Sequence, residues 1–441
     1  MSGIKGQAAW LLGSNFFSAI LQIIQISVLA RVLQLNELGV LAIINTVLAI
    51  AMILQDMGMS SYIVYKQDMT KEQQSTIYWI NFLLSLFTGF IVFALSIPIS
   101  RFYNMPQLES LIMLASVNFI FLGSLSQYQA HYIKSKKMIL LSKIEIGAKF
   151  ISFVFVIWAI YNTELRTSAV ILGLILNAVL RLCFMSLLGN REWRPIFRFE
   201  KTMVRDVFNY GVYQLGSQVI NQLRTQLDVI IVGKILGGES LGLYSLAKDL
   251  ILQPLKLIAP VINRLALPRF AEKQRELHEL KEIFLRGTFV IAVFSSCIYL
   301  VIYLFSPIII TLLYGNERLS IINILPFMLV FGVLRPMGGL TGAIAQANGK
   351  TNVEFVWNMV AGAAVLCISA TIIIWPSLWY VSLILSVTQI LISFLVFPFF
   401  IRSVVGVSFL SYLKQWIPVT IAFIMISAVI YNFNIHVYPF W

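Results

Sequence analysis

The 441 residues are 59% hydrophobic and only 12% charged, whereas soluble globular chains are about half apolar and about a quarter charged. These values exclude a soluble globular protein, because too few charged residues are present to cover a water-facing surface. Apolar runs of about 20 residues, each long enough to cross a bilayer as a helix, recur from one end of the chain to the other. The composition therefore predicts an all-α polytopic membrane protein.

The net charge of +13 follows from where the basic residues lie. A nucleic-acid-binding protein would gather them on one soluble surface. Here they lie in connections between apolar segments, which favours a topological explanation. All three cysteines lie in apolar segments and the three histidines are scattered, which argues against a disulfide framework and a metal site. No cofactor and no metal are expected.

Thirteen apolar segments are predicted to span the membrane. They cover residues 9–30, 39–64, 76–100, 109–131, 140–161, 166–188, 206–233, 241–266, 284–314, 320–345, 353–375, 379–401 and 414–433. The ninth is long and contains Pro307, which predicts a kink or a tilt. Connections after even-numbered spans are basic, whereas those after odd-numbered spans hold at most one basic residue. The positive-inside rule places the basic connections, and with them the N-terminus, in the cytoplasm.

The second half of the chain repeats the first at an offset of 203 residues, the distance from Leu12 to Leu215. Residues 12–15 (LGSN) align with residues 215–218 (LGSQ), and Asn45 aligns with Lys248. Each copy would hold six spans, so both have the same orientation, and a site is expected between them. We therefore expect two six-helix bundles around a central cavity and about one extra C-terminal helix. The predicted boundaries are a first lobe over 1–190, a cytoplasmic linker over 191–205, a second lobe over 206–403 and a hydrophobic segment over 404–441.

Polar stripes on two predicted spans carry the functional prediction. On 206–233, five polar residues recur at spacings of three and four and so share one face: Gln214, Ser217, Asn221, Arg224 and Asp228. On 241–266 a similar stripe lies next to Lys248: Asp249, Gln253, Lys256 and Asn263. A charged side chain inside such a span costs roughly 2.5 kcal/mol or more unless it faces water or a partner. The two stripes therefore predict the wall of a hydrated cavity.

The charges inside the predicted spans are more often basic than acidic. The basic set is Arg224, Lys248, Lys256 and Arg335, and the acidic set is Asp56, Asp228 and Asp249. One explanation is structural: Arg224 pairs with Asp228, Asp249 pairs with Lys256, and the pairs fix helix packing. The functional explanation is a cationic vestibule for a phosphate- or carboxylate-bearing head group, with the three aspartates as candidate proton- or cation-coupling sites. Lys149 and Arg181 are assigned to the cytoplasmic boundary and left out of the site.

Several motifs resemble Wzx-type polysaccharide flippases of the O-antigen and colanic-acid kind. They are LARVL at 29–33, QDMGM at 55–59, YWIN at 78–81, FNYG at 208–211, DVIIVG at 228–233, LGLY at 241–244 and LPRF at 267–270. The resemblance covers about residues 1–410. It implies membership of the multidrug/oligosaccharidyl-lipid/polysaccharide exporter superfamily. It also implies alternating access that moves an undecaprenyl-diphosphate-linked oligosaccharide across the bacterial cytoplasmic membrane, which is the inner membrane.

The resemblance also suggests roles for the polar residues. The four basic residues would bind diphosphate or acidic sugars: Arg224, Lys248, Lys256 and Arg335. Four amides would contact sugar hydroxyls: Gln214, Gln218, Asn221 and Gln253. Polysaccharide polymerase machinery is a further candidate partner. The thirteenth span is a departure, because relatives usually show an even number.

Two alternative functions would each require sequence features that differ from those of a flippase. A cation-coupled exporter of small drug-like molecules would share the fold, but a basic cavity would repel cationic substrates. A membrane enzyme acting on lipid-linked sugars would need a substantial periplasmic loop with catalytic residues, and every predicted outer connection is short. We therefore expect a transporter and not an enzyme.

Overall fold

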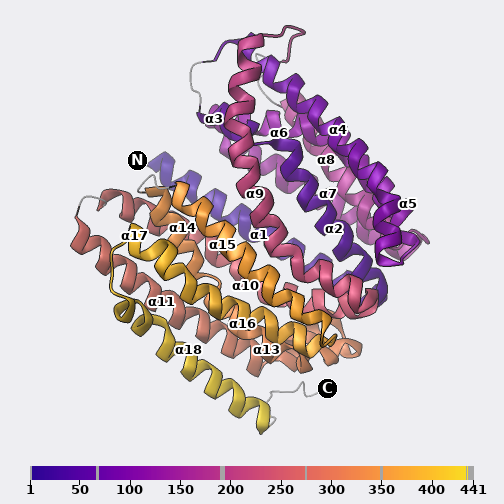
Figure 1. Ribbon diagram of the computed structural model, residues 1–441. Helices are drawn as coiled ribbons and strands as arrows, with labels where there is room; N and C mark the ends of the chain where they lie inside the picture. The colour runs from indigo at the N-terminus through magenta and orange to yellow at the C-terminus, as the bar shows by residue number, and fades with distance from the viewer. Residues whose placement is uncertain are drawn as a thin grey trace. The chain divides into compact units, whose positions relative to one another are not determined.

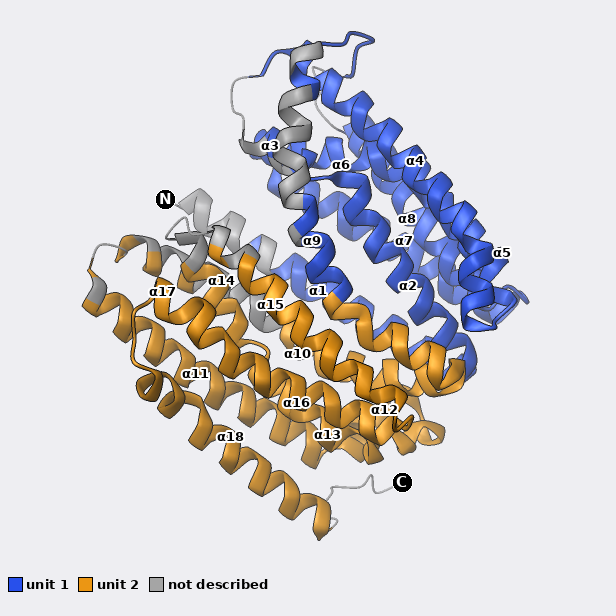
Figure 2. Cartoon of the chain, in the orientation of Figure 1, with its two compact units in different colours: residues 1–223 blue, residues 224–441 orange. Residues whose placement is uncertain are grey.

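The computed structural model describes residues 2–65, 69–188, 194–273, 276–347, 351–433 and 435, and every regular element among these residues is helical (Figure 1). The all-α prediction is therefore confirmed. The chain divides into two compact units, residues 1–223 (unit 1) and residues 224–441 (unit 2) (Figure 2). The division falls inside one continuous helix, α9 (Lys201–Ile235). The predicted lobe boundaries near 190, 206 and 403 rest on the repeat and stay a prediction.

Unit 1 is a bundle in which α4 packs on α5 and α6, α7 packs on α1 and α8, and α6 packs on α8. Besides the first part of α9, its described helices are α1 Ser2–Val32, α2 Leu35–Asp56, α3 Met59–Tyr65, α4 Lys71–Tyr103, α5 Gln107–Ser116, α6 Asn118–Lys134, α7 Met138–Asn162 and α8 Thr167–Leu188. One apolar cluster joins α3, α4 and α6 through Met59, Ile77 and Ala130. A second joins α6, α7 and α8 through Leu125, Leu141 and Met185.

The predicted span over 39–64 is interrupted immediately after Asp56, which corrects the expectation of one continuous helix. Met57 has φ 43° and Gly58 has φ 73°, a left-handed conformation that ends a helix and that glycine adopts at low cost. The Met57 N–H still donates to the Ile53 carbonyl at 3.2 Å and so caps α2. The break places Asp56 at a helix end instead of in the middle of a span.

The described part of the connection between α8 and α9, residues 194–200, is fastened to α4. The Trp79 indole donates to the Ile196 carbonyl at 3.0 Å, and its ring stacks on Phe197 with centroids 4.4 Å apart. The Thr76 hydroxyl accepts from the Glu200 N–H at 2.9 Å. These bonds attach the segment that leads into α9 to unit 1.

Unit 2 is a second bundle, in which α13 packs on α16, α11 on α18 and α10 on α14. Besides the end of α9, its described helices are α10 Gly237–Glu272, α11 Leu277–Leu304, α12 Ser306–Tyr314, η1 Asn316–Asn323, α13 Leu325–Leu334, α14 Met337–Ala347, α15 Thr351–Ser369, η2 Ala370–Ile373, α16 Leu378–Val396, the π-helical turn η3 Phe397–Ile401, α17 Arg402–Val404 and α18 Phe409–Asn432. The ninth predicted span breaks at Phe305, two residues before Pro307, so the predicted kink is confirmed.

The tenth predicted span is also broken, at Arg335 and Pro336, which the sequence interpretation did not anticipate. Proline has no N–H to continue the helical hydrogen bonds, and its ring clashes with the preceding turn. The Arg335 N–H still bonds the Phe331 carbonyl at 2.9 Å, so α13 keeps its hydrogen bonds up to the break. Arg335 therefore lies at a helix junction and not inside a continuous helix.

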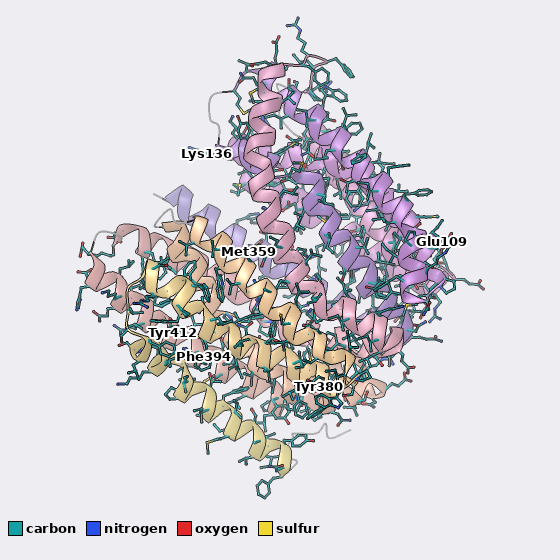
Figure 3. All side chains as sticks on the ribbon, in the orientation of Figure 1. Glu109, Lys136, Met359, Tyr380, Phe394 and Tyr412 are labelled. Atoms are coloured by element: carbon teal, nitrogen blue, oxygen red, sulfur yellow. The ribbon has the colours of Figure 1, made fainter. Side chains whose placement is uncertain are left out.

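The helix α18 belongs to the unit 2 bundle. The Tyr412 hydroxyl donates to the Ser393 carbonyl at 3.2 Å, and the Trp416 ring lies edge-on to Phe394 at 5.2 Å. Figure 3 shows Tyr412 and Phe394 next to each other where α18 begins. Trp416 is only 2% exposed. The extra C-terminal segment predicted from hydropathy is therefore a helix that is packed on the rest of unit 2.

Eleven helical segments of the described chain are long and apolar enough to cross a membrane, and they coincide with eleven of the thirteen predicted spans. The protein is therefore a multi-pass membrane protein. The remaining two predicted spans lie in α9 and α10, which have 35 and 36 residues. At 1.5 Å per residue each is about 50 Å long, more than the roughly 30 Å of hydrocarbon. Parts of both helices have side chains outside the described residues, so membrane crossing by these two helices stays a prediction.

A glycine in α13 allows close packing inside unit 2 and provides a test of it. A Cβ on Gly332 would lie 2.6 Å from Cζ of Tyr299. Tyr299 is fully buried and its hydroxyl donates to the Ile251 carbonyl at 2.7 Å, so its ring has little freedom to move. We expect Gly332→Ala to lower the free energy of unfolding by about 1–3 kcal/mol. The measurement is the melting temperature of the detergent-solubilised protein. Gly338→Ala is the control, because a Cβ there meets nothing within 4 Å; equal melting temperatures would contradict the packing.

Candidate functional site

Six charged side chains of unit 2 form one electrostatically connected group, here called the charged cluster. They are Arg224 and Asp228 of α9, Lys248, Asp249 and Lys256 of α10, and Arg335 at the junction of α13 and α14. The one-turn spacing on α9 places its two members on one face. The helix α10 packs on both α13 and α14, which brings the Arg335 junction to the same region. The structure therefore joins all six intramembrane charges that were predicted for the second half of the chain.

An ion pair between α9 and α10 lies at the centre of the charged cluster. Lys248 Nζ lies 2.6 Å from Asp228 Oδ2, and both side chains are only 12% exposed. The hydroxyl of the fully buried Tyr244 donates to the same Asp228 oxygen at 2.5 Å. Lys248 also donates to the Thr225 carbonyl at 3.3 Å. Lys248 and Asp228 thus neutralise each other and connect the two helices, so the structural explanation holds for this pair.

Two guanidinium groups lie near this pair. Arg335 interacts electrostatically with Asp228 and with Arg224, and its guanidinium lies 5.8 Å from the centre of the Phe331 ring. Both arginine side chains are partly exposed. Like charges at close range repel each other, and an anionic ligand between them would relieve that repulsion. Guanidinium groups also bind phosphate and carboxylate oxygens through paired, charge-assisted hydrogen bonds.

The other end of the charged cluster lies on α10. Asp249 is partly buried and interacts electrostatically with Lys256 and Lys248. Lys256 is exposed. Once Lys248 is matched with Asp228, the cluster retains Arg224, Arg335 and Lys256 against the single carboxylate of Asp249. The charged cluster is therefore net positive, as the sequence interpretation requires.

The predicted amide residues lie on the two helices that carry most of the charged cluster. Gln218 and Asn221 lie on α9 and are at least partly exposed. Gln253 lies on α10, one turn before Lys256 in the chain, and its Nε2 atom is buried without a hydrogen bond to any described residue. The side chain of Gln214 lies outside the described residues. Sugar contacts by these amides stay a prediction.

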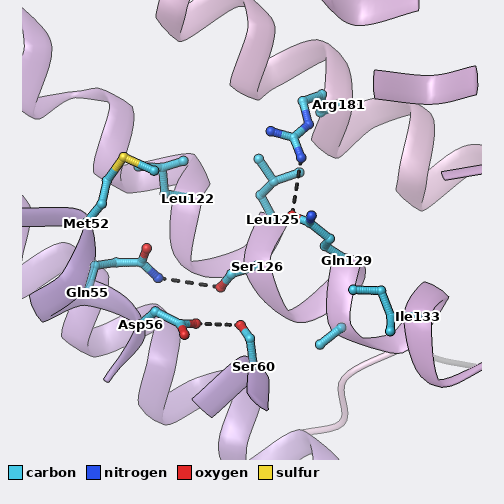
Figure 4. A pocket seen from close by; sticks show the side chains of 11 residues that line it. Met52, Gln55, Asp56, Ser60, Leu122, Leu125, Ser126, Gln129, Ile133 and Arg181 are labelled. Carbon is cyan, nitrogen blue, oxygen red and sulfur yellow. Dashed lines mark hydrogen bonds between the residues drawn. The ribbon is translucent and has the colours of Figure 1, made fainter. Parts of the chain in front are cut away.

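The remaining candidate, Asp56, belongs to unit 1 and lines a pocket of about 650 Å³ there (Figure 4). The Ser60 hydroxyl donates to Asp56 Oδ1 at 2.5 Å. Arg181, which the sequence interpretation leaves out of the site, also lines this pocket and donates to Glu145 at 2.9 Å and to Gln129 at 3.2 Å. Gln129 and Ser126 were missed because neither is charged, although their spacing of three places them on one face of α6.

Comparison with known proteins agrees with this fold. Residues 28–323 match the family described as polysaccharide biosynthesis protein. The chain is 56% identical to the amylovoran biosynthesis protein AmsL of Erwinia amylovora, over 87% of this chain and 99% of AmsL. It is 27% identical to the lipopolysaccharide biosynthesis protein WzxC of Escherichia coli (strain K12), over 90% of this chain and 81% of WzxC.

Among solved structures the chain resembles the lipid II flippase MurJ, with a TM-score of 0.75, 14% identity and coverage of 98% of this chain and 94% of MurJ. It also resembles a multidrug resistance MATE family transporter of the MOP superfamily, with a TM-score of 0.63, 14% identity and coverage of 94% and 95%. The fold is thus that of a class of multi-pass helical membrane proteins. Within this class, the chain belongs to the polysaccharide biosynthesis protein family. The resemblance predicted from the sequence motifs is confirmed.

Proposed function

We propose that the protein is a flippase that moves an undecaprenyl-diphosphate-linked oligosaccharide from the cytoplasmic to the periplasmic leaflet of the bacterial inner membrane. The charged cluster is the observation that carries this proposal, because it offers a net-positive, partly exposed group in a helical membrane protein. Relatives named for amylovoran and lipopolysaccharide biosynthesis support a carbohydrate substrate. The basic connections support a cytoplasmic N-terminus.

Within the charged cluster the residues have separate roles. Arg224, Arg335 and Lys256 bind the diphosphate or acidic sugars, while the polyprenyl chain stays in lipid. Lys248 contributes mainly through its pair with Asp228, which orders α9 against α10. The amides of Gln214, Gln218, Asn221 and Gln253 contact sugar hydroxyls. The substrate crosses by alternating access through a cationic cavity.

Three aspartates are proposed for coupling to a proton or cation. Asp249 is partly buried among two lysines, so gain or loss of its charge would change the balance of the charged cluster. Asp228 is engaged by Lys248 and Tyr244, and uptake of a proton would remove the negative charge that pairs with Lys248. Asp56 lies at the break between α2 and α3, where it accepts a hydrogen bond from Ser60.

A cation-coupled drug exporter is the nearest alternative, because the fold also resembles a multidrug transporter. The excess of basic side chains in the charged cluster opposes a cationic substrate. A membrane enzyme that acts on lipid-linked sugars has less support, because the solved structures with a similar fold are a lipid II flippase and a multidrug resistance transporter. Polysaccharide polymerase machinery is then a partner that consumes the product on the periplasmic side.

Deletion of the gene in the source bacterium tests the proposal. We expect loss of surface polysaccharide and accumulation of the lipid-linked oligosaccharide in the inner leaflet of the inner membrane. The measurement is glycosidase accessibility of this lipid in everted and in right-side-out vesicles. A strain that lacks the polymerase is the control, because its intermediate should accumulate in the outer leaflet instead. Normal surface polysaccharide without accumulation in the deletion strain would contradict the proposal.

A further inference from the structure

The pocket in unit 1 has the size and the construction of a small-molecule site. Its volume of about 650 Å³ lies within the roughly 300–1,000 Å³ that is typical of ligand pockets. Its lining comes from the end of α2, from α3, from α6 and from α8: Met52, Gln55, Asp56, Ser60, Leu122, Leu125, Ser126, Gln129, Ala130, Ile133 and Arg181. Figure 4 shows Asp56 and Ser60 at one end, and Arg181 and Gln129 at the other. All of these residues belong to unit 1, whereas the charged cluster belongs to unit 2.

The polar side chains on the α2 side of the pocket are held in place by buried partners. Gln55 Nε2 donates to Asn81 Oδ1 at 2.8 Å and to the Ser126 hydroxyl at 3.5 Å. Asn81 is fully buried and donates to Ser126 Oγ at 3.0 Å. Ordered polar groups of this kind lower the entropic cost of binding a ligand. The pocket thus presents preorganised amide and hydroxyl groups.

The charges of the pocket disfavour an anion. Arg181 is already paired with Glu145 at 2.9 Å, and Asp56 adds a carboxylate to the wall. A diphosphate would be repelled by Asp56 and would have to compete with Glu145 for Arg181. A divalent cation is also poorly matched, because Ca²⁺ prefers six to eight oxygen ligands and Asp56 is the one carboxylate among the described lining residues. A neutral ligand fits better.

The combination of donors, acceptors and apolar surface matches a sugar ring. Each sugar hydroxyl both donates and accepts hydrogen bonds. Asp56 offers acceptors, and Arg181 Nε is a buried donor without a hydrogen bond to any described residue. Gln55 and Gln129 carry both kinds of atom. The side chains of Met52, Leu122, Leu125 and Ile133 supply apolar surface for the C–H faces of the ring.

We propose that the unit 1 pocket binds one sugar residue of the transported oligosaccharide, separately from the diphosphate at the charged cluster. This inference rests on the proposed function. The pocket residues lie in or next to the half of each predicted span that the positive-inside rule places toward the cytoplasm, where lipid-linked oligosaccharides are assembled under that proposal. The pocket would then contribute to the selection of the glycan, while the charged cluster recognises the part that all lipid-linked substrates share.

Binding to the purified full-length protein tests this inference with two probes. The first probe is the oligosaccharide that mild acid releases from the lipid-linked pool of the deletion strain, and the second is undecaprenyl diphosphate without sugar. We expect Gln129→Leu and Asp56→Asn each to raise the Kd for the oligosaccharide about tenfold, since one lost hydrogen bond to a fixed partner is worth about 1.4 kcal/mol. The Kd for undecaprenyl diphosphate should change less than about twofold.

Asn177→Leu is the matched control for these variants. It removes one hydrogen bond, to Ser152 at 3.2 Å, from the helix α8 that also carries Arg181, but it does not line the pocket. Its oligosaccharide Kd should equal that of the wild type. If the melting temperature shows that the Asp56→Asn variant does not fold, the Ser126→Ala variant is measured in its place.

Three outcomes would overturn the inference. They are no oligosaccharide binding by the wild-type protein, an unchanged Kd in Gln129→Leu and Ser126→Ala, or an effect confined to Asp56→Asn, which would indicate a cation site. None of these affects the proposed function, which fails separately if the deletion strain keeps its surface polysaccharide.

Discussion

Replacing Arg224 or Arg335 by alanine is expected to abolish surface polysaccharide while leaving the amount of protein in the membrane unchanged. Each substitution removes a guanidinium whose charge-assisted hydrogen bonds to a diphosphate are worth about 1.5–3 kcal/mol each, or roughly a tenfold or greater loss of affinity. Folding should tolerate either change, because the two arginines repel each other. The measurements are surface polysaccharide by lectin staining and protein by immunoblot of membranes.

Two further variants in the same experiment test whether the effect depends on the place of the basic residue in the charged cluster or only on the loss of one positive charge. Lys256→Ala should also abolish surface polysaccharide, since Lys256 is the exposed basic residue of the charged cluster. Lys234→Ala is the control, because it removes a positive charge from the last turn of the same helix α9, outside the charged cluster. Normal polysaccharide in both Arg224→Ala and Arg335→Ala would remove these residues from the site.

Asp228→Asn is expected to destabilise the protein strongly. It leaves Lys248 with 12% exposure and without its carboxylate, and breaking a buried ion pair in this way typically costs about 3–5 kcal/mol. The asparagine oxygen can still accept from Tyr244, so the effect reports the lost charge and not the lost hydrogen bond. The measurement is the melting temperature of the purified protein together with its yield from membranes.

Removal of both charges should reverse most of this loss. In Asp228→Asn/Lys248→Met neither member of the pair carries a charge, and replacement of a buried pair by groups of similar volume is often nearly neutral. A double variant as unstable as Asp228→Asn would show that the pair does not act as one unit. A stable double variant without transport would assign Lys248 a direct role in substrate binding.

The positions of the helices could be predicted because span length and apolar composition are properties of each segment alone. Eleven predicted spans coincide with helices of the structure. The kink near Pro307 was predictable for the same reason, since proline interrupts its own helix. The breaks at Met57 and at Pro336 were missed, because the apolar pattern continues across both and hides the local backbone signals.

In the candidate site, too, some features could be predicted from the sequence and others could not. The spacing of Arg224 and Asp228 is enough to predict that they share one face of a helix. That spacing equally allows them to pair with each other, whereas the structure pairs Asp228 with Lys248 and Tyr244 of the next helix. The place of Arg181 near the end of a span predicts a position at the membrane boundary, but α6 and α8 together make it part of a pocket wall.

The sequence by itself determined that this protein is a helical multi-pass membrane protein with charged faces on two of its helices, because hydropathy, length and periodicity are read along the chain. Only the tertiary structure decided which charges neutralise each other and which stay in excess. It also decided that Gln55, Ser126 and Arg181 share one pocket. The physical reason is that ion pairs and hydrogen bonds depend on ångström distances between residues that the chain separates by tens of positions.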